Sequence, residues 1–167
     1  DAIEQDLLSD YRVVINIVSQ KEALDLINKR RAVKHEESNL ESDALTISMM
    51  AGFIKTVEKY DLSHVITFHN RIKQAKDMAT NLTQLFPTLS TKFTPENISI
   101  KHVASKGMTT GERIRRLKRF RNSKEGINIL TNARCLTEGV DVRAVDGIVF
   151  FEPKSSKIDI LQAVGRA

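Results

Sequence analysis

The sequence predicts an α/β fold in which helices cover a mostly parallel sheet, and three observations lead to this prediction. From residue 61 onward, short β-branched runs alternate with amphipathic segments, a pattern typical of parallel strands joined by right-handed crossovers. The chain has 167 residues, a size at which one domain buries roughly 70% of its unfolded surface. Hydrophobic residues make up 41% of the sequence, close to the average of soluble domains, so one core is expected.

The segment 1–60 is expected to supply a strand and helices that complete the domain whose core is 61–167. Its first apolar run is rich in valine and isoleucine, which favours a strand, and two later runs have helical spacing. Ser42 or Asp43 is a suitable N-cap for the second helix. The expected elements are a strand at 11–18, a helix at 20–31, a loop at 34–43 and a helix at 44–60.

In the core segment, hydrophobic periodicity and capping residues mark the elements. Asn70 stands where a helix N-cap is needed, and Pro87 is expected to end that helix. Thr109 and Glu112 fit a capping box at the start of the next helix. The expected elements are strands at 65–68, 98–103, 127–131 and 147–151, with helices at 72–86, at 109–122 and from about 158.

Charge is distributed unevenly along the chain. The segment 1–60 holds 8 Lys and Arg against 11 Asp and Glu, whereas 61–167 holds 18 against 10. Such an excess of positive charge suits a polyanionic partner, because phosphates attract Lys and Arg at long range and binding releases counterions. A well-solvated basic surface is the alternative interpretation.

The expected helix at 109–122 concentrates this charge. Ile114, Leu117 and Phe120 recur every third position and are expected to face the sheet. The remaining positions are left either to solvent or to contact with nucleic acid, and because aromatic residues are sparse, phosphate contacts are favoured over base stacking. The basic residues are Arg113, Arg115, Arg116, Lys118, Arg119 and Arg121.

Other features exclude several classes of protein. No apolar run approaches the ~20 residues of a membrane-spanning helix, and the first residues lack the pattern of a secretory signal. With Cys135 as its single cysteine, the chain is expected to be a soluble cytoplasmic protein without membrane partners. The histidines lie on different expected elements and no zinc-ligand spacing occurs, so no metal site is expected. These histidines are His35, His64, His69 and His102.

A loop follows the expected strand that ends at Thr131. The carboxyl edge of a parallel sheet, where this loop begins, is the edge at which open α/β folds bind ligands. Gly139 permits backbone conformations that other residues resist, so a ribose or phosphate can approach closely. Asp141 offers an acceptor for a sugar hydroxyl. The loop is therefore a candidate ligand site.

Four segments resemble sequence motifs of superfamily-2 helicases, and they follow one another along the chain as they do in that family. Thr131-Asn-Ala-Arg-Cys-Leu-Thr-Glu-Gly-Val-Asp141 is similar to motif V and Gln162-Ala-Val-Gly-Arg166 to motif VI. The segment 65–71 is similar to motif IV. The segment 102–113 resembles the part of the family in which a histidine-glycine turn leads into a helix bearing Glu-Arg, although the turn here is Ser105-Lys-Gly107.

The resemblance covers about residues 62–167 and implies the second lobe of a helicase, with a three-layer, RecA-like α/β/α fold of the P-loop NTPase type. The segments 138–142 and 151–166 look closest to bacterial DEAD/H-type DNA helicases of the kind found with restriction systems or mobile elements. The resemblance implies ATP-driven movement along DNA, with RNA possible as the substrate.

The resemblance also implies roles for individual residues. Arg166 would be the catalytic residue, because a guanidinium stabilises charge that develops on the transferred phosphoryl group. The ATP contacts implied are Gly139, Asp141, Gln162, Gly165 and Arg166. The nucleic-acid contacts implied are His69, Asn70, Arg71, Lys106, Gly107, Thr131 and Asn132.

Two segments that a complete helicase needs do not occur in the sequence. There is no Gly-x-x-x-x-Gly-Lys-Ser/Thr phosphate loop and no Asp-Glu box after a hydrophobic strand. ATP and Mg²⁺ are therefore expected to be held mostly by an N-terminal RecA-like lobe of the same parent protein, and this chain alone is expected to be inactive as an ATPase. The alternatives are an α/β nucleotide- or small-molecule-binding enzyme outside the helicases and a basic protein-interaction module.

Overall fold

The computed structural model of the chain describes residues 12–15, 21, 25, 40–133 and 145–152. The chain divides into two compact units, of which one is 13–60 and the other combines 61–167 with 1–12. Each unit is considered by itself. The role of segment 1–60 in completing the domain stays a prediction.

The expected strand at 11–18 is not present in its described part. Residues 12–15 have no regular secondary structure, and Val13 and Ile15 are 75% and 82% exposed. The prediction is wrong for these four residues, because β-branched side chains favour a strand only where a neighbouring strand pairs with it. Lys21 and Asp25, within the expected helix at 20–31, are both helical.

Helix α2 begins earlier than expected. It spans Leu40–Lys59, so Ser42 and Asp43 lie inside the helix and the prediction that either caps it is wrong. The loop expected at 34–43 is therefore wrong for residues 40–43, because the first turn of a helix needs no hydrophobic period and tolerates acidic residues beside its positive end. Farther along, α2 buries a stripe of apolar side chains at helical spacing. These are Ile47, Met50, Ile54 and Val57.

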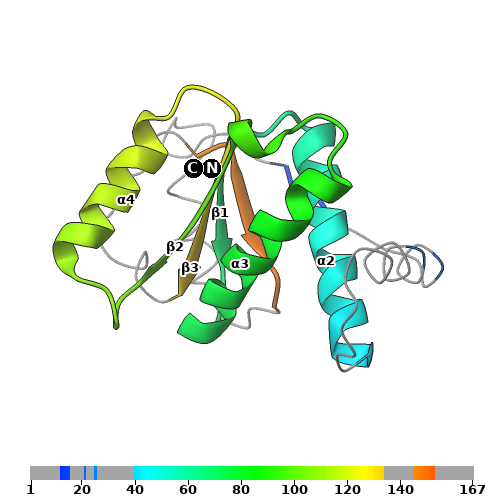
Figure 1. The fold of residues 1–167 in the computed structure, drawn as a ribbon, viewed down its shortest axis with the longest axis horizontal. Coiled ribbons are helices and arrows are strands. Elements are labelled where there is room, and N and C mark those ends of the chain that lie inside the picture. Colours follow the sequence, from blue (N-terminus) through cyan, green and yellow to red (C-terminus); the bar gives the residue numbers. More distant parts are fainter. Residues whose placement is uncertain (1–11, 16–20, 22–24, 26–39, 134–144, 153–167) are drawn as a thin grey trace, which may run out of the picture. The chain divides into compact units, whose positions relative to one another are not determined.

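The sheet contains four strands, and every pairing in it is parallel. Their order is β2-β3-β1-β4, so β3 lies between the two strands that precede it in the chain (Figure 1). All four expected core strands are confirmed, with small shifts of their ends. The strands are β1 His64–Phe68, β2 Ile98–Ala104, β3 Ile127–Ala133 and β4 Gly147–Phe150.

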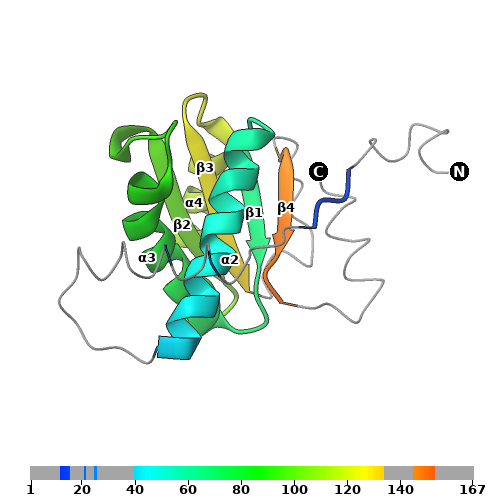
Figure 2. The same cartoon turned by 90° about the vertical axis from the view of Figure 1, so that its right-hand side faces the viewer.

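Two helices cover opposite faces of this sheet, as Figure 1 and Figure 2 show. The chain passes from β1 over β3 to β2 and then returns to β3, and right-handed crossovers in these opposite directions place their helices on opposite faces. The predicted layered α/β fold is confirmed. Among the described residues, no helix has the length and apolar character required to cross a membrane. The helices are α3 Ile72–Leu89 and α4 Thr110–Asn122, and the short 3₁₀ helix η1 spans Pro95–Asn97.

Both ends of α3 differ from the prediction. Its N-cap is Arg71 rather than Asn70, and no side chain caps it. Pro87 lies inside the helix, which continues to Leu89. Because proline has no N–H, the carbonyl of Thr83 lacks its usual helical hydrogen bond. Thr83 is an exposed residue, so water can bind this carbonyl instead. The bond from the Ser90 N–H to the Phe86 carbonyl, at 2.8 Å, closes the last turn.

Helix α4 is capped by Thr109 as expected, but only half of the predicted capping box forms. The Thr109 hydroxyl accepts a hydrogen bond from the Glu112 N–H at 3.2 Å. The Glu112 carboxylate instead accepts a hydrogen bond from Arg116 at 2.5 Å. A guanidinium one turn along the helix is a stronger donor than a backbone amide, so the charged pair replaces the second bond of the box.

The apolar stripe of α4 is narrower than predicted. Phe120 is buried and Leu117 packs against the same cluster, but Ile114 is 46% exposed. Residues three apart in an α-helix differ by about 60° in direction, so two such steps turn Ile114 roughly 120° away from Phe120. On this face of the sheet, the buried cluster comprises Ile66, Phe68, Val103, Phe120, Leu130 and Val145.

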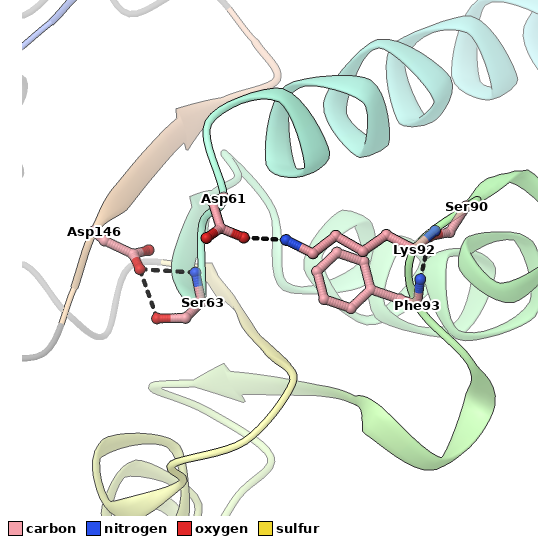
Figure 3. Close-up of polar contacts among 6 residues, drawn as sticks. All are labelled: Asp61, Ser63, Ser90, Lys92, Phe93 and Asp146. Carbon is pink, nitrogen blue, oxygen red and sulfur yellow. Dashed lines mark hydrogen bonds and ion pairs between the residues drawn. The ribbon is translucent and has the colours of Figure 1, made fainter.

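The amino edge of the sheet is fixed by a carboxylate. Asp146, just before β4, accepts hydrogen bonds from the N–H and the hydroxyl of Ser63, both at 2.7 Å (Figure 3). It also accepts one from the His64 N–H at 2.9 Å. Figure 3 also shows the Asp61–Lys92 ion pair, which joins the start of this unit to the turn after α3. These contacts align the beginnings of β1 and β4.

We predict that Gly126→Ala destabilises the protein. Gly126 has φ of +69°, and a Cβ there would lie 2.0 Å from the carbonyl oxygen of Asn97. Because both the conformation and the backbone contact oppose a side chain, the free energy of unfolding should fall by at least about 2 kcal/mol in chemical denaturation. Gly111→Ala, in α4 with open space around it, is the control and should be neutral or stabilising. Equal effects of the two substitutions would contradict this account.

Candidate nucleic-acid interface

The carboxyl ends of three strands are level with one another. Asn132 of β3 pairs with Phe68 of β1 on one side and with Val103 of β2 on the other. The loops after β1 and β2 therefore leave the same edge, on either side of β3 and about 10 Å apart, given the usual spacing of strands. This arrangement brings the predicted nucleic-acid residues at 69–71 and 105–107 to one edge, which we call the carboxyl edge.

This edge carries positive charge from two sources. Arg71 and Lys106 are exposed there, as are Asn70 and Gly107, and within the described part of the chain neither cation forms an ion pair. Both α3 and α4 begin at this edge, and helix N-termini present unpaired N–H groups and a partial positive charge. The first turn of α3 contains no acidic residue. The edge is therefore suited to phosphate groups.

The other predicted contacts on this edge are buried. His69, Thr131 and Asn132 are 3%, 0% and 0% exposed. The His69 N–H donates to the Asn132 carbonyl at 2.9 Å, which extends the pairing of β1 with β3 by one residue. The His69 ring stacks on Phe151, with centroids 5.6 Å apart, and its Nε2 lies 2.9 Å from the Thr67 hydroxyl. These side chains form a layer beneath the exposed loop.

Thr131 connects this layer to α3. Its hydroxyl donates to the Ala75 carbonyl at 2.6 Å, and both residues are fully buried. The bond fixes the end of β3 against the first turn of α3, whose N-cap is Arg71. Thr131 therefore links β3 to the helix whose N-cap is Arg71.

The residues expected to contact ATP lie outside the described residues. Among those that the structure describes, no three His, Cys, Asp or Glu side chains come together as metal ligands. The expected ATP contacts outside the described ranges are Gly139, Asp141, Gln162, Gly165 and Arg166.

A polar network that the sequence analysis did not predict holds Arg116 against β2. The Arg116 guanidinium donates to the His102 carbonyl at 2.6 Å and to Nδ1 of the His102 ring at 3.1 Å. Because a guanidinium can only donate, Nδ1 is the acceptor and the neutral ring carries its proton on Nε2. The spacing of Glu112 and Arg116 indicates their ion pair, but nothing in the sequence indicates the contact with His102.

The network also lowers the pKa of His102. Burial is the main cause, the positive charges of Arg116 and Lys76 add to it, and the negative charge of Glu112 opposes it. At neutral pH the His102 ring is therefore neutral, and its Nδ1 accepts the hydrogen bond from Arg116. Protonation would replace that acceptor with a second positive charge.

The parallel sheet and its basic edge define the chain as an α/β domain of the class that binds ligands at the carboxyl ends of its strands. Residues 48–167 match the family model described as the helicase conserved C-terminal domain. The chain belongs to this family of helicase C-terminal domains. The predicted family is confirmed.

Individual proteins resemble the chain in sequence or in fold. A protein of Methanocaldococcus jannaschii named "Putative ATP-dependent RNA helicase" is 40% identical over 62 residues, which are 37% of this chain and 8% of that protein. The structure of the ATP-dependent Type ISP restriction-modification enzyme LlaBIII bound to DNA has a TM-score of 0.71 at 24% identity, over 99% of this chain and 11% of that one.

Two further structures share the fold. Domain 2 of the DEAD-box helicase Mss116p bound to an RNA duplex has a TM-score of 0.57 at 20% identity, over 74% of this chain and 45% of that one. The Hef helicase domain of Pyrococcus furiosus has a TM-score of 0.51 at 20% identity, over 87% of this chain and 32% of that one. The chain thus spans less than half the length of each of these four matched chains.

We predict that the pKa of His102 lies below its usual value near 6.5 and rises when Arg116 is replaced. Arg116→Gln removes a positive charge beside the ring, whereas Arg121→Gln on the exposed side of α4 should leave the pKa unchanged. The folded protein binds this proton less readily than the unfolded chain. The contribution of His102 to the free energy of unfolding is therefore fully present above about pH 6.5, and it is lost as the pH falls through the pKa of His102 in the folded protein. Imidazole NMR titration of the two variants checks the prediction, and equal pKa values in both would contradict it.

We also predict that Thr131→Val lowers the free energy of unfolding by about 1 kcal/mol, because it removes a buried hydrogen bond without changing the size of the side chain. Thr80→Val is the control, since the Thr80 hydroxyl makes a comparable bond to the Lys76 carbonyl on the exposed side of α3. Chemical denaturation of both variants measures the difference. An equal loss in the control would mean that the buried bond has no special role.

Proposed function

We propose that this lobe binds the sugar-phosphate backbone of a nucleic acid along its carboxyl edge. The observation that supports the proposal best is the convergence of Arg71, Lys106 and the N-termini of α3 and α4 on one edge. Gly107 has φ of +76°, a left-handed conformation that glycine adopts readily, and it lets the backbone of the turn approach a phosphate closely. Asn70 adds an exposed polar side chain.

In this proposal the buried residues of the edge position the contacts. His69, Thr131 and Asn132 are buried, so we assign their side chains to holding the loops rather than to reaching the ligand through exposed atoms. The exposed side chains Asn70, Arg71 and Lys106 supply the direct contacts.

We further propose that the whole protein is an ATP-dependent helicase or translocase that acts in the cytoplasm. In this proposal the motif V and VI residues contact ATP at a cleft between two lobes, and Arg166 is the catalytic arginine. An N-terminal RecA-like lobe of the parent protein supplies the phosphate loop and most contacts to Mg²⁺. The present chain alone then hydrolyses ATP negligibly, because those groups do not occur in its sequence. The proposed ATP contacts are Gly139, Asp141, Gln162, Gly165 and Arg166.

DNA is the substrate that we propose. The likeness in fold to the DNA-bound restriction-modification enzyme over 99% of the chain supports a restriction-type DNA translocase. RNA is the second candidate, favoured by the local identity of 40% to a protein named as an RNA helicase. Phosphate contacts by themselves do not distinguish the two, since the 2′-hydroxyl is the group that separates RNA from DNA.

We predict that Lys106→Gln weakens binding to single-stranded and duplex DNA and reduces its salt dependence. Loss of one phosphate contact should reduce the slope of log affinity against log salt by about 0.7 to 0.9. Lys124→Gln, beyond the other end of α4, removes the same charge at the opposite edge of the sheet and is the matched control. Fluorescence anisotropy over a series of salt concentrations measures both variants.

The same titrations, repeated with RNA of the same sequence, test the choice of substrate. A preference for DNA at equal salt supports the proposal, and a preference for RNA favours the second candidate. If the two lysine variants lose affinity equally, binding depends on net charge alone and the carboxyl edge has no special role.

A further inference from the structure

A pocket of about 370 Å³ lies between β2 and α4. Ser99 and Lys101 line it from β2, which is the outermost strand of the described sheet. Lys101 precedes the turn that begins at Ser105 by four residues, which is about 13 Å along a strand. Glu112, in the first turn of α4, brings one end of the pocket close to the carboxyl edge, whereas Lys101 and Arg119 line it farther along β2 and α4. Its lining from α4 includes Glu112, Arg115, Arg116 and Arg119.

The charges in this pocket are not balanced. Glu112 is the one carboxylate that lines it, and this group is bound to Arg116, which also donates to the His102 carbonyl. Within the described ranges, no ion pair engages Lys101, Arg115 or Arg119. Arg115 and Arg119 are four residues apart on one helix face, a spacing at which like charges destabilise a helix. An anion in the pocket would remove this repulsion.

From these observations we propose that the pocket between β2 and α4 binds a phosphate of the nucleic-acid backbone, at a second position outside the carboxyl edge. Arg115 and Arg119 present guanidinium groups that can bind phosphate oxygens through two parallel hydrogen bonds, and Lys101 adds a point charge from the facing strand. The choice of nucleic acid as the source of the phosphate rests on the proposed function.

The lining favours a backbone phosphate over a bound nucleotide. Phe120 is the aromatic residue of the pocket, and it is 5% exposed because its ring packs in the core, in edge contact with His64. A base would therefore lack an open aromatic face on which to stack. The remaining core residues of the lining, Ile129 and Leu130, are each 1% exposed. The exposed recognition groups are thus mainly cationic.

The test compares two double variants of the 167-residue chain that remove equal charge from the same helix. Arg115→Gln with Arg119→Gln changes the pocket, whereas Lys118→Gln with Arg121→Gln changes exposed positions of α4 that do not line it. For duplex DNA measured by anisotropy, the pocket variant should bind on the order of tenfold more weakly, with a salt slope reduced by about 0.9, as the loss of one phosphate contact predicts. The control should change affinity by less than about threefold. Unchanged thermal unfolding of both variants establishes that they are folded.

The comparison with Lys106→Gln separates this inference from the proposed function. Loss of affinity in Lys106→Gln but not in the pocket variant overturns the pocket site and leaves the carboxyl edge in place. Loss in the pocket variant alone supports the pocket and overturns the edge. Equal losses in the pocket variant and its charge-matched control overturn the pocket, because net charge then explains both.

A second measurement identifies the ligand. The Nε–H resonances of Arg115 and Arg119 are followed by NMR during addition of duplex DNA, inorganic phosphate or polyglutamate. Shifts with DNA at lower concentration than with the other two support a backbone phosphate. Saturation by inorganic phosphate at an equal concentration would assign the pocket to a free phosphate instead, and an equal response to polyglutamate would assign it to acidic protein segments. Either result overturns the proposal.

Discussion

The parallel register of β3 between β2 and β1 determines where the proposed functional groups lie. All seven residues of β3 are buried, and hydrogen bonds to a neighbouring strand extend along both of its sides. A shift of one residue would exchange the side chains on the two covered faces of the strand and break the bond between Thr131 and α3. The level ends of β1, β2 and β3 follow from this register, and so does the common edge from which the loops at 69–71 and 105–107 begin.

Polar residues within this buried register connect β3 to its neighbours at the edge. A buried hydroxyl or backbone group costs free energy unless it is hydrogen bonded, so each such group restricts the arrangement of its surroundings. Thr131 uses its hydroxyl to hold α3, and Asn132 uses its carbonyl to hold the first residue after β1. Both bonds lie next to Arg71, whose side chain remains exposed above them.

Much of the core was predictable from the sequence, since alternating β-branched and amphipathic segments record the burial of strands and helices. The predictions were wrong where secondary structure or burial depends on contacts with residues that are distant in the sequence. Val13 and Ile15 have strand propensity but no paired strand, and Pro87 is tolerated because it lies in the last turn of a helix. The edge loops were found through motifs, whereas burial of His69 depends on Phe151, which is distant in sequence.

The basic residues of α4 also show why composition does not define a binding surface. An α-helix distributes successive residues around its axis, so the six cations cannot all face one ligand. Arg116 is fixed by His102 and Glu112, whereas Arg115 and Arg119 line the pocket and Lys118 and Arg121 face elsewhere. The charge excess attracts a polyanion from a distance, but only cations that converge with a facing group such as Lys101 can hold one phosphate. Geometry therefore divides one charged helix into a structural residue, a candidate phosphate site and a solvated face.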